Sequence, residues 1–222
     1  MALPKFVALL QTQSLFLARL DRLKDLHEGS LPRAVSESRL ATLRESNSVP
    51  ADAELSDISR KVRSACYVNC WAISTFESEA LWRLYTVLGD GVALRTSYQK
   101  LIDLAAPDDD MYLGMVTYID YETEWFPDGN LFYPVMHKRR SFAHEQEVRF
   151  LKFLYQHVPL NTPPGPLGIT APVGLDALVE EIFVSPYAEE WYAQTVRAVV
   201  EKFAPELIPK IRWSKMKNAP SY

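Results

Sequence analysis

The segment His137 to Phe150 holds the densest grouping of chemically capable side chains in the chain. Its sequence, HKRRSFAHEQEVRF, contains four basic residues, two histidines and two glutamates directly before an apolar stretch. If Glu145 to Tyr155 is a strand, alternation places Glu145, Glu147 and Arg149 on one face and the intervening apolar side chains on the other. Such a patch can hold a carboxylate with a raised pKa, grip a phosphate or bind a metal ion.

Glu145 and Glu147 are the candidate catalytic residues. Two carboxylates two positions apart on a strand lie side by side, with Cβ atoms about 6 to 7 Å apart. One can orient a substrate hydroxyl while the other stabilises developing positive charge or acts as a base. The alternative is a solvated strand end in which Glu147 pairs with Arg149 or Lys138, because ion-pair networks mimic active sites. Arg149 has apolar neighbours on its face, so we expect it at the border of the core with a partner.

Lys138 begins the basic run Lys138-Arg139-Arg140, which could receive the phosphates of a dinucleotide or of RNA. The alternative is a solvated helix face, because isolated surface charges are common. The four histidines show no HExxH or other metal-binding arrangement, so no metal site is predicted. Cys66 and Cys70 are expected to be buried, inert thiols, since their spacing suits neither a disulfide nor a zinc site.

A second group of candidates lies where a strand is expected to lead into a helix. Ser74 and Glu77 fit a capping box for a helix over Glu77–Leu88. Trp71 and Trp82 fit the packing of that helix on a sheet. The functional alternative is an anion site at the start of the helix, with aromatic walls suited to stacking a nucleobase or nicotinamide.

Length and composition predict a single domain over residues 1–222. The chain has a mass of 25.3 kDa and 48% hydrophobic residues, enough for one substantial core. A net charge of -4 does not indicate a general polyanion-binding surface. The apolar N-terminal stretch is interrupted by Lys5 and Arg19 without a cleavable leader, and no apolar run reaches the length of a membrane span. We therefore expect a soluble, cytoplasmic protein with no membrane partner.

The order of the expected elements predicts an α+β fold, with a mixed or antiparallel sheet and flanking helices. No GxGxxG motif and no P-loop is present. The expected helices are Leu3–Gln11, Pro32–Ser46, Ala53–Ser64, Glu77–Leu88, Tyr98–Ala106, Leu131–Phe142, Leu175–Glu180 and Ala188–Phe203. The expected strands are Ser14–Ala18, Ala65–Ile73, Gly91–Thr96, Met111–Tyr121, Glu145–Tyr155, Gly168–Pro172, Ile182–Ser185 and Lys210–Ser214.

Six segments in order resemble the bacterial and phage family known as domain of unknown function 2971. They are KFVALLQTQSLFLARLDRLKDLHEGSLP, YVNCWAISTFESEALWRLY, GVALRTSYQKL, VTYIDY, FYPVMHKRRSFAHEQEVR and LVEEIFVSPYAEEW. The resemblance covers essentially the whole chain and implies a related fold. Two departures stand out: family members usually begin with a short strand resembling W-R-Y-M before the segment matching Lys5 to Leu10, and they often have a histidine where this chain has Ala72.

The layout of the candidate site is also similar to the three-part site of ADP-ribosyltransferases, which is built on a split sheet. The shared features are an N-terminal aromatic or basic strand, a middle strand ending in serine or an aromatic helix, and a later Glu-x-Glu. The resemblance implies that Glu147 is the catalytic glutamate that orients the nicotinamide ribose of NAD, and that Glu145 assists acceptor selection. It implies that Ser74 supports the nicotinamide pocket and that Arg149 or Lys138 meets the pyrophosphate.

Three hypotheses about function follow. The first is an ADP-ribosyltransferase-like enzyme of phage defence or toxin biology, which takes NAD as a co-substrate, binds no cofactor tightly and passes ADP-ribose to protein, nucleic acid or water. The second is a magnesium-dependent nuclease with Asp25 or Glu28, together with Glu145 and Glu147, as oxygen ligands. The third is a non-catalytic binding module, with a groove that lacks aligned carboxylates or an exposed apolar edge strand near the N-terminus.

Overall fold

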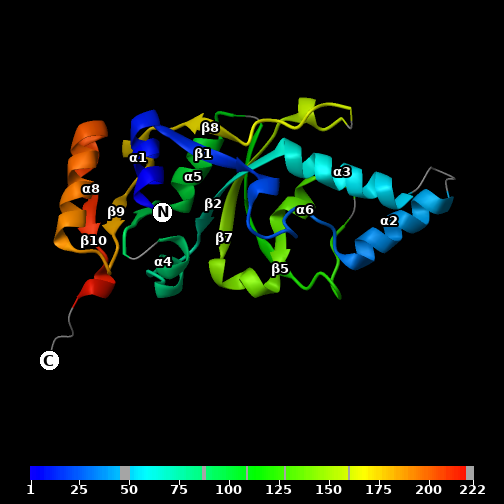
Figure 1. The fold of residues 1–222 in the computed structure, drawn as a ribbon, viewed down its shortest axis with the longest axis horizontal. Coiled ribbons are helices and arrows are strands. Elements are labelled where there is room, and N and C mark those ends of the chain that lie inside the picture. Colours follow the sequence, from blue (N-terminus) through cyan, green and yellow to red (C-terminus); the bar gives the residue numbers. More distant parts are fainter. Residues whose placement is uncertain (46–50, 87–88, 109, 128, 160, 219–222) are drawn as a thin grey trace. The chain divides into compact units, whose positions relative to one another are not determined.

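The computed structural model describes residues 1–45, 51–86, 89–108, 110–127, 129–159 and 161–218. Helices and mostly antiparallel strands are interspersed along it, which confirms the α+β class (Figure 1). Its contacts divide into two compact units. Unit 1 comprises Met1–Phe16, Ser74–Pro107 and Thr170–Tyr222, and unit 2 comprises Leu17–Ile73 and Asp108–Ile169. Neither unit is one continuous stretch of sequence. Within the described residues, no helix is both long and apolar enough to cross a membrane.

The largest sheet has five strands. Their order is β4 (Met111–Met115), β7 (Glu147–Phe153), β2 (Cys66–Ala72), β1 (Ser14–Arg19) and β8 (Gly168–Pro172). The strand β7 is antiparallel to both of its neighbours, β2 and β4. Six of its seven residues are buried, as expected for a strand with a partner on each side.

One face of β7 changes from apolar to charged along the strand. Directly opposed residues of antiparallel strands share a face, so the register with β2 fixes which side chains meet. The opposed pairs on this face are Cys66 with Phe153, Val68 with Leu151, Cys70 with Arg149, and Ala72 with Glu147. The sheet therefore has an apolar half and a charged half on the same side.

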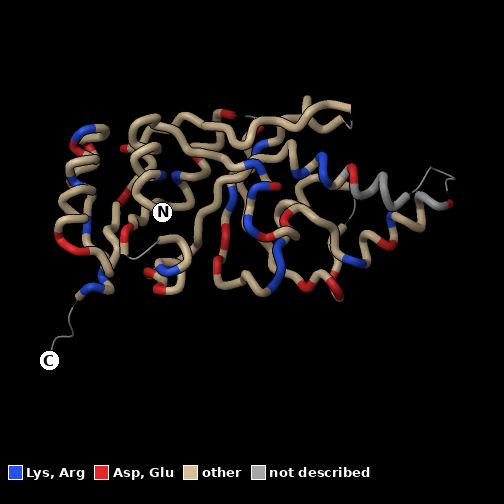
Figure 2. The backbone as a smooth tube through the Cα atoms, in the orientation of Figure 1, with Lys and Arg blue, Asp and Glu red and all other residues tan. Residues whose placement is uncertain are grey.

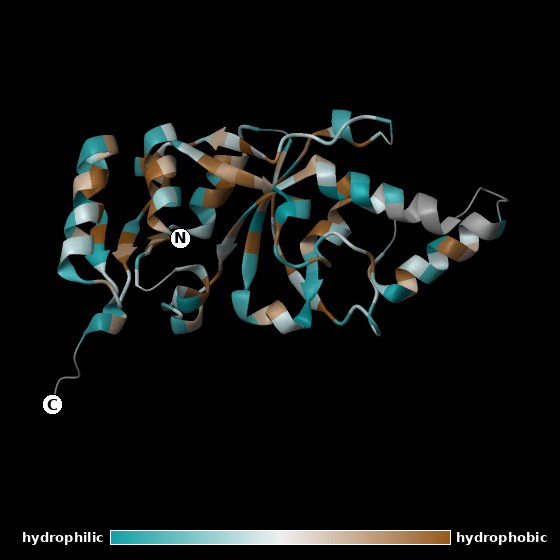
Figure 3. Ribbon diagram, viewed as in Figure 1, coloured by the Kyte–Doolittle hydropathy of each residue, from teal (hydrophilic) through white to brown (hydrophobic). Residues whose placement is uncertain are grey.

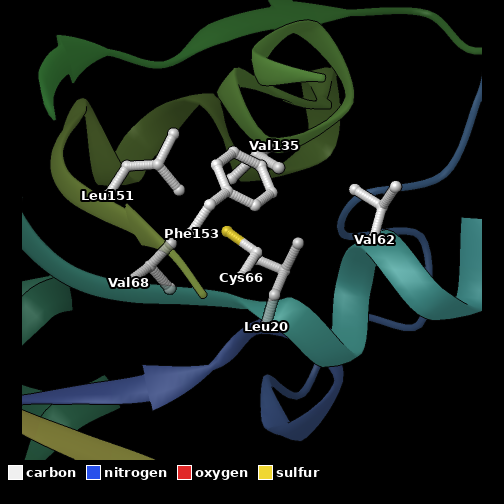
Figure 4. Packing of buried hydrophobic residues seen from close by; sticks show 7 residues of the cluster. All are labelled: Leu20, Val62, Cys66, Val68, Val135, Leu151 and Phe153. Atoms are coloured by element: carbon white, nitrogen blue, oxygen red, sulfur yellow. The ribbon is translucent and has the colours of Figure 1, made fainter. Parts of the chain in front are cut away.

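The apolar half lies in the core of unit 2 (Figure 4). The buried cluster there consists of Leu20, Val62, Cys66, Val68, Val135, Leu151 and Phe153. Three covering elements contribute to it: the 3-10 turn η1 (Leu20–Arg22), α3 (Ala51–Ala65) and α6 (Phe132–Met136). Burial raises the pKa of the Cys66 thiol well above its ordinary value, which confirms a buried, neutral cysteine there. Cys70 differs from the expectation because the residue is exposed, yet burial around its sulfur raises the pKa of the thiol to about 12, so it is neutral as well.

Two predicted elements of unit 2 are divided in the structure. The expected strand Met111–Tyr121 forms β4 and β5 (Thr117–Ile119), with a break at Val116. The expected helix Leu131–Phe142 ends at Met136, and the chain continues as the strand β6 (His137–Arg139), which pairs in parallel with β5. The 3-10 helix η2 (Arg140–Glu145) then leads to β7. The other helical elements described in this unit are helix α2 (Arg33–Glu45) and the turn η3 (Tyr155–His157).

Unit 1 contains the sheet β10-β9-β3 and most of the remaining helices. The strand β10 is parallel to β9, and β3 is antiparallel to it. Hydrophilic and hydrophobic residues alternate along its longest helix, α8 (Figure 3), where Tyr192, Val196 and Val200 are buried. The elements of this unit are α1 (Leu3–Thr12), α4 (Glu79–Tyr85), β3 (Val92–Arg95), α5 (Tyr98–Ala105), α7 (Leu175–Leu178), β9 (Glu181–Val184), α8 (Glu190–Phe203), η4 (Pro205–Lys210), β10 (Ile211–Trp213) and η5 (Lys215–Lys217).

The apolar half of the sheet should make a large contribution to the stability of the fold. Replacing Leu151, which is 1% exposed, by alanine should lower the free energy of unfolding by about 2 to 5 kcal/mol, because it leaves a cavity in the cluster. The matched control is Leu26→Ala, since Leu26 is 80% exposed and should change the unfolding midpoint little. Urea unfolding followed by circular dichroism compares the two. Equal losses would show that this cluster is not the core.

Candidate functional site

The charged half of the sheet lies in a buried cluster of five ionisable side chains, all in unit 2. Each member exposes 6% of its surface or less. The members are Glu28, Lys138, Glu145, Glu147 and Arg149. We call this group the charge cluster. A charged group is found at such depth only when it is paired and hydrogen-bonded, so the pairing inside the cluster decides whether it can exist.

The ammonium group of Lys138 contacts three carboxylates. Its Nζ lies 2.5 Å from Glu145 Oε2, 2.8 Å from Glu147 Oε1 and 3.2 Å from Glu28 Oε1. Burial by itself would lower the pKa of Lys138, but hydrogen bonds to Glu145 and Glu147 raise it above the ordinary value. The side chain is therefore a fixed positive charge that holds the two glutamates next to each other.

The guanidinium of Arg149 joins β7 to the turn that contains Glu28. Its two terminal nitrogens donate to Glu28, at 2.8 and 2.9 Å, in a bidentate arrangement. Its Nε donates to Glu147 Oε2 at 2.6 Å, and Nη1 also donates to the Val135 carbonyl at 2.7 Å. Burial would lower the pKa of Arg149, yet the facing carboxylates keep it well above its ordinary value. The expectation that Arg149 meets a partner at the core is confirmed.

Glu145 and Glu147 have opposite protonation preferences. Burial raises the pKa of Glu145, and its hydrogen bond with Glu147 raises it further, against the effect of Lys138. Burial acts in the same direction on Glu147, but the bond with Glu145, together with Arg149 and Lys138, lowers the pKa of Glu147 to about 2. Neighbouring groups whose pKa values diverge in this way are the usual sign of an acid and base assignment. Glu147 therefore stays ionised to a low pH, whereas Glu145 is the carboxylate of the pair that binds a proton more readily.

The lowered pKa of Glu147 has a direct consequence for stability. A carboxyl group that is more acidic in the folded state stabilises the fold above its unfolded pKa, and the effect disappears as the pH falls. For Glu147 the loss takes place between its ordinary value of 4.5 and about 2. The raised pKa of Glu145 acts in the opposite sense, because deprotonation of Glu145 costs more in the folded state.

The charge cluster carries an excess of negative charge beside an open surface. Three carboxylates face two cations, so the fully ionised cluster has a net charge of -1. Ala72 and Cys70 lie opposite Glu147 and Arg149 in the sheet, and both are exposed. Their side chains are small. This surface can therefore accept a group that approaches the cluster, and the net charge favours a cationic one.

Tyr118 is a site residue that the sequence did not single out. It lies in β5 opposite Lys138, and its hydroxyl oxygen accepts the backbone N–H of Glu147 at 2.8 Å. Burial raises the pKa of Tyr118, so the hydroxyl keeps its proton and can donate it. Tyr118 lies within the expected strand Met111–Tyr121, but its contact with Glu147 depends on the division of that strand at Val116.

The structure brings together the predicted residues Glu145, Glu147, Arg149 and Lys138, with three corrections. Glu147 and Arg149 share a face, as expected, but Glu145 ends η2 and is followed by Gln146 in a left-handed conformation at φ 43°. Glu145 therefore reaches the cluster through Lys138 and not by strand alternation. The expected pairs of Glu147 with Arg149 and Lys138 exist, yet they are buried and the solvated alternative is wrong. Lys138 is likewise part of a strand and not of a solvated helix face.

The predicted capping box is wrong. Ser78 caps α4 by accepting the N–H of Leu81, and Ser74 is exposed and bonds to the backbone of Phe76. Glu77 accepts instead from the indole of Trp82, with its Oε2 3.1 Å from Nε1. The chain stays irregular up to Ser78, so Ser74 lies too far ahead of the helix to cap it. The end expected at Leu88 lies outside the described residues, and the described helix ends at Tyr85.

The aromatic candidates are placed away from the face of Glu147. Trp71 lies opposite Val148 in the register, which puts it on the other side of the sheet, and its indole donates to Asn69 at 2.7 Å. Trp82 is buried in α4 of unit 1, as expected for packing. Ser74 also belongs to unit 1. Of the cofactor candidates, only Arg149 and Lys138 are in the charge cluster.

The carboxylates proposed as magnesium ligands are already neutralised by side chains. Glu28, Glu145 and Glu147 surround the Lys138 ammonium, whereas Asp25 pairs with Arg139 at 2.6 Å. In the part of the chain that the structure describes, no group of three or more His, Cys, Asp or Glu residues is arranged to hold a metal ion. Comparison of the chain with family models, with curated proteins and with solved structures finds no match.

Removal of the Arg149 charge should strongly lower the stability of the folded protein. The variant Arg149→Met keeps much of the side-chain volume but leaves Glu28 and Glu147 buried with a lost partner, so the free energy of unfolding should fall by about 3 to 5 kcal/mol. The control is Arg60→Met, because the Arg60 pair with Asp57 is solvent-exposed and should contribute about 0 to 1 kcal/mol. Denaturant unfolding measures both. If the two variants are equally stable, the charge cluster does not hold unit 2 together.

Proposed function

We propose that this chain is an enzyme that cleaves the bond between nicotinamide and ribose in NAD, in the manner of ADP-ribosyltransferases, with Glu147 as the carboxylate at the reacting ribose. One observation carries the proposal. Two adjacent glutamates are held by the same ammonium group, and their pKa values are shifted in opposite directions.

The chemistry needs a carboxylate that stays ionised next to a cation that forms during the reaction. Loss of nicotinamide gives the ribose an oxocarbenium-like character, and a fixed negative charge at the ring stabilises it. Glu147 meets this need, because its pKa of about 2 keeps it ionised at neutral pH. Glu145 has a raised pKa and can take the proton of an attacking hydroxyl, which is the task of a general base.

The electrostatics beside Glu147 suit the substrate. The nicotinamide ring of NAD carries a positive charge, and the ionised charge cluster has a net charge of -1. Attraction between the two would bring the reacting bond towards Glu147. Ala72 would form the floor on which the ring lies, since it is small and exposed on the face of Glu147.

The roles of the two basic residues change in this proposal. Arg149 is 0% exposed and its donors are directed at Glu28, Glu147 and Val135, so it positions Glu147 and does not meet the pyrophosphate. Lys138 positions Glu145 and Glu147 in the same way. Magnesium-dependent nuclease activity is less well supported, because the Lys138 ammonium fills the place among the carboxylates that a metal ion would need.

The proposal is tested by incubating the protein with NAD and following nicotinamide release by chromatography. The variant Glu147→Gln keeps the shape of the side chain but removes its charge, so release should fall by about a hundredfold or more. The control Glu201→Gln makes the same change at an exposed position of α8 and should leave the rate unaltered.

A thermal unfolding curve of Glu147→Gln shows whether a loss of release is due to unfolding. If this variant does not fold, Glu145→Gln is tested in its place. That change removes the carboxylate proposed to take the proton of the attacking hydroxyl, so it should alter the pH dependence of nicotinamide release. Equal release by the wild type and by folded Glu147→Gln would contradict the role of Glu147. Release no faster than in buffer alone would contradict the activity itself.

A further inference from the structure

The strand β4 is the outermost strand of the five-stranded sheet, and among the described residues its one partner strand is β7. All of its residues are exposed or half-buried, whereas its neighbour β7 is almost wholly buried. An edge of this kind offers backbone N–H and C=O groups that can pair with another extended chain.

The register shows which backbone groups of β4 point outward. Val116 donates its N–H to the Glu147 carbonyl, and bonded pairs in an antiparallel ladder alternate along the strand. Tyr112 and Gly114 therefore direct their backbone groups at β7, and Leu113 and Met115 direct theirs away from it. Outside the ladder, no backbone hydrogen bond to Leu113 or Met115 is found among the described residues.

The segment that contains this edge is strongly acidic. Between residues 108 and 136 the sequence has no lysine or arginine. The acidic residues of this segment that the structure describes are Asp108, Asp110, Asp120, Glu122 and Glu124. Three of these residues have partners elsewhere in unit 2: Asp108 pairs with Lys152, Glu122 with Arg33, and Glu124 with Arg140. Asp110 is exposed and has no ion-pair partner within the described part of the chain. Figure 2 marks acidic residues in red along this part of the backbone.

Exposed apolar side chains accompany the acidic residues. Met115 is 65% exposed and Tyr112 is 38% exposed, and they lie on opposite faces of β4. A strand added to the edge would cover part of both. Backbone pairing gives affinity in this mode of binding, and alternate side-chain contacts give specificity.

We propose that β4 is a docking edge for an extended, lysine- or arginine-rich polypeptide segment, which adds to the sheet as a further strand. Charge complementarity selects this occupant. A second copy of the chain that paired β4 with β4 would bring two acidic segments together, and their repulsion opposes that arrangement. The inference concerns binding alone and does not depend on the NAD chemistry proposed above.

The test uses three synthetic probes of about nine residues, enough to span the strand. The first alternates lysine with threonine, the second replaces each lysine by glutamate, and the third is the lysine peptide with alternate backbone amides N-methylated. Binding to the full chain is measured by fluorescence anisotropy. The lysine peptide should bind more weakly as salt is added, and the other two should bind at least about tenfold more weakly, because one loses the charge match and the other the ladder.

A pair of variants locates the contact. Leu113→Pro removes an N–H that faces outward, so it should abolish binding of the lysine peptide while leaving the bonds between β4 and β7. Leu113→Thr keeps the N–H and should retain binding. Should Leu113→Pro fail to fold, hydrogen exchange of the wild type replaces it, and the peptide should protect the Leu113 and Met115 amides.

Three results would overturn the proposal. They are equal binding of the N-methylated and parent peptides, absence of binding by the lysine peptide, and unchanged exchange of the Leu113 and Met115 amides when the peptide is bound. A dimer of the free protein that Leu113→Pro dissociates would also overturn it, by showing that a second copy takes the edge.

Discussion

The burial of the Arg149 guanidinium is the constraint on which unit 2 depends. A positive charge with no exposed surface can be kept in a protein only if carboxylates and carbonyls replace its water. Glu28, Glu147 and the Val135 carbonyl do so, and each comes from a different element. The turn at Glu28, the helix α6 and the strand β7 must therefore meet at one point. Lys138 is needed for the same reason. Arg149 balances only one of the two buried negative charges of Glu28 and Glu147, and the Lys138 ammonium balances the other.

The backbone conformations of Gly29 and Gln146 allow the carboxylates of the charge cluster to come together. Gly29 follows Glu28 with a positive φ of 73°, and a Cβ there would come within 2.6 Å of a Leu20 methyl carbon, so no larger residue fits beside this carboxylate. Gln146 separates the two glutamates in a left-handed conformation at φ 43°. This conformation takes Glu145 out of the strand while Glu147 stays in it. The two carboxylates thus acquire different surroundings although only one residue lies between them, and their pKa values diverge for that reason.

Local patterns in the sequence were enough to predict the α+β class, β7 and the shared face of Glu147 and Arg149, because strand alternation is a property of neighbouring residues. Contacts between distant segments could not be predicted in the same way. Glu28 and Arg149 are 121 positions apart, and nothing local to either residue indicates the other. The basic run at Lys138 had the composition of a solvated surface, and only the three carboxylates around it explain why it is buried. The capping box failed because Ser78 was an equally good cap nearer the helix.

Titration of the Glu145 and Glu147 side-chain carboxyl groups by carbon-13 NMR tests the charge cluster most directly. We expect a pKa of about 2 for Glu147 and a pKa for Glu145 above its ordinary value of 4.5. In Lys138→Met, provided that the variant folds, the pKa values of both groups should rise, because the ammonium lowers both of them in the wild type. If both carboxyl groups titrate near 4.5 in the wild type, the pair is solvated, and neither the buried charge cluster nor the proposed roles of the two glutamates can be correct.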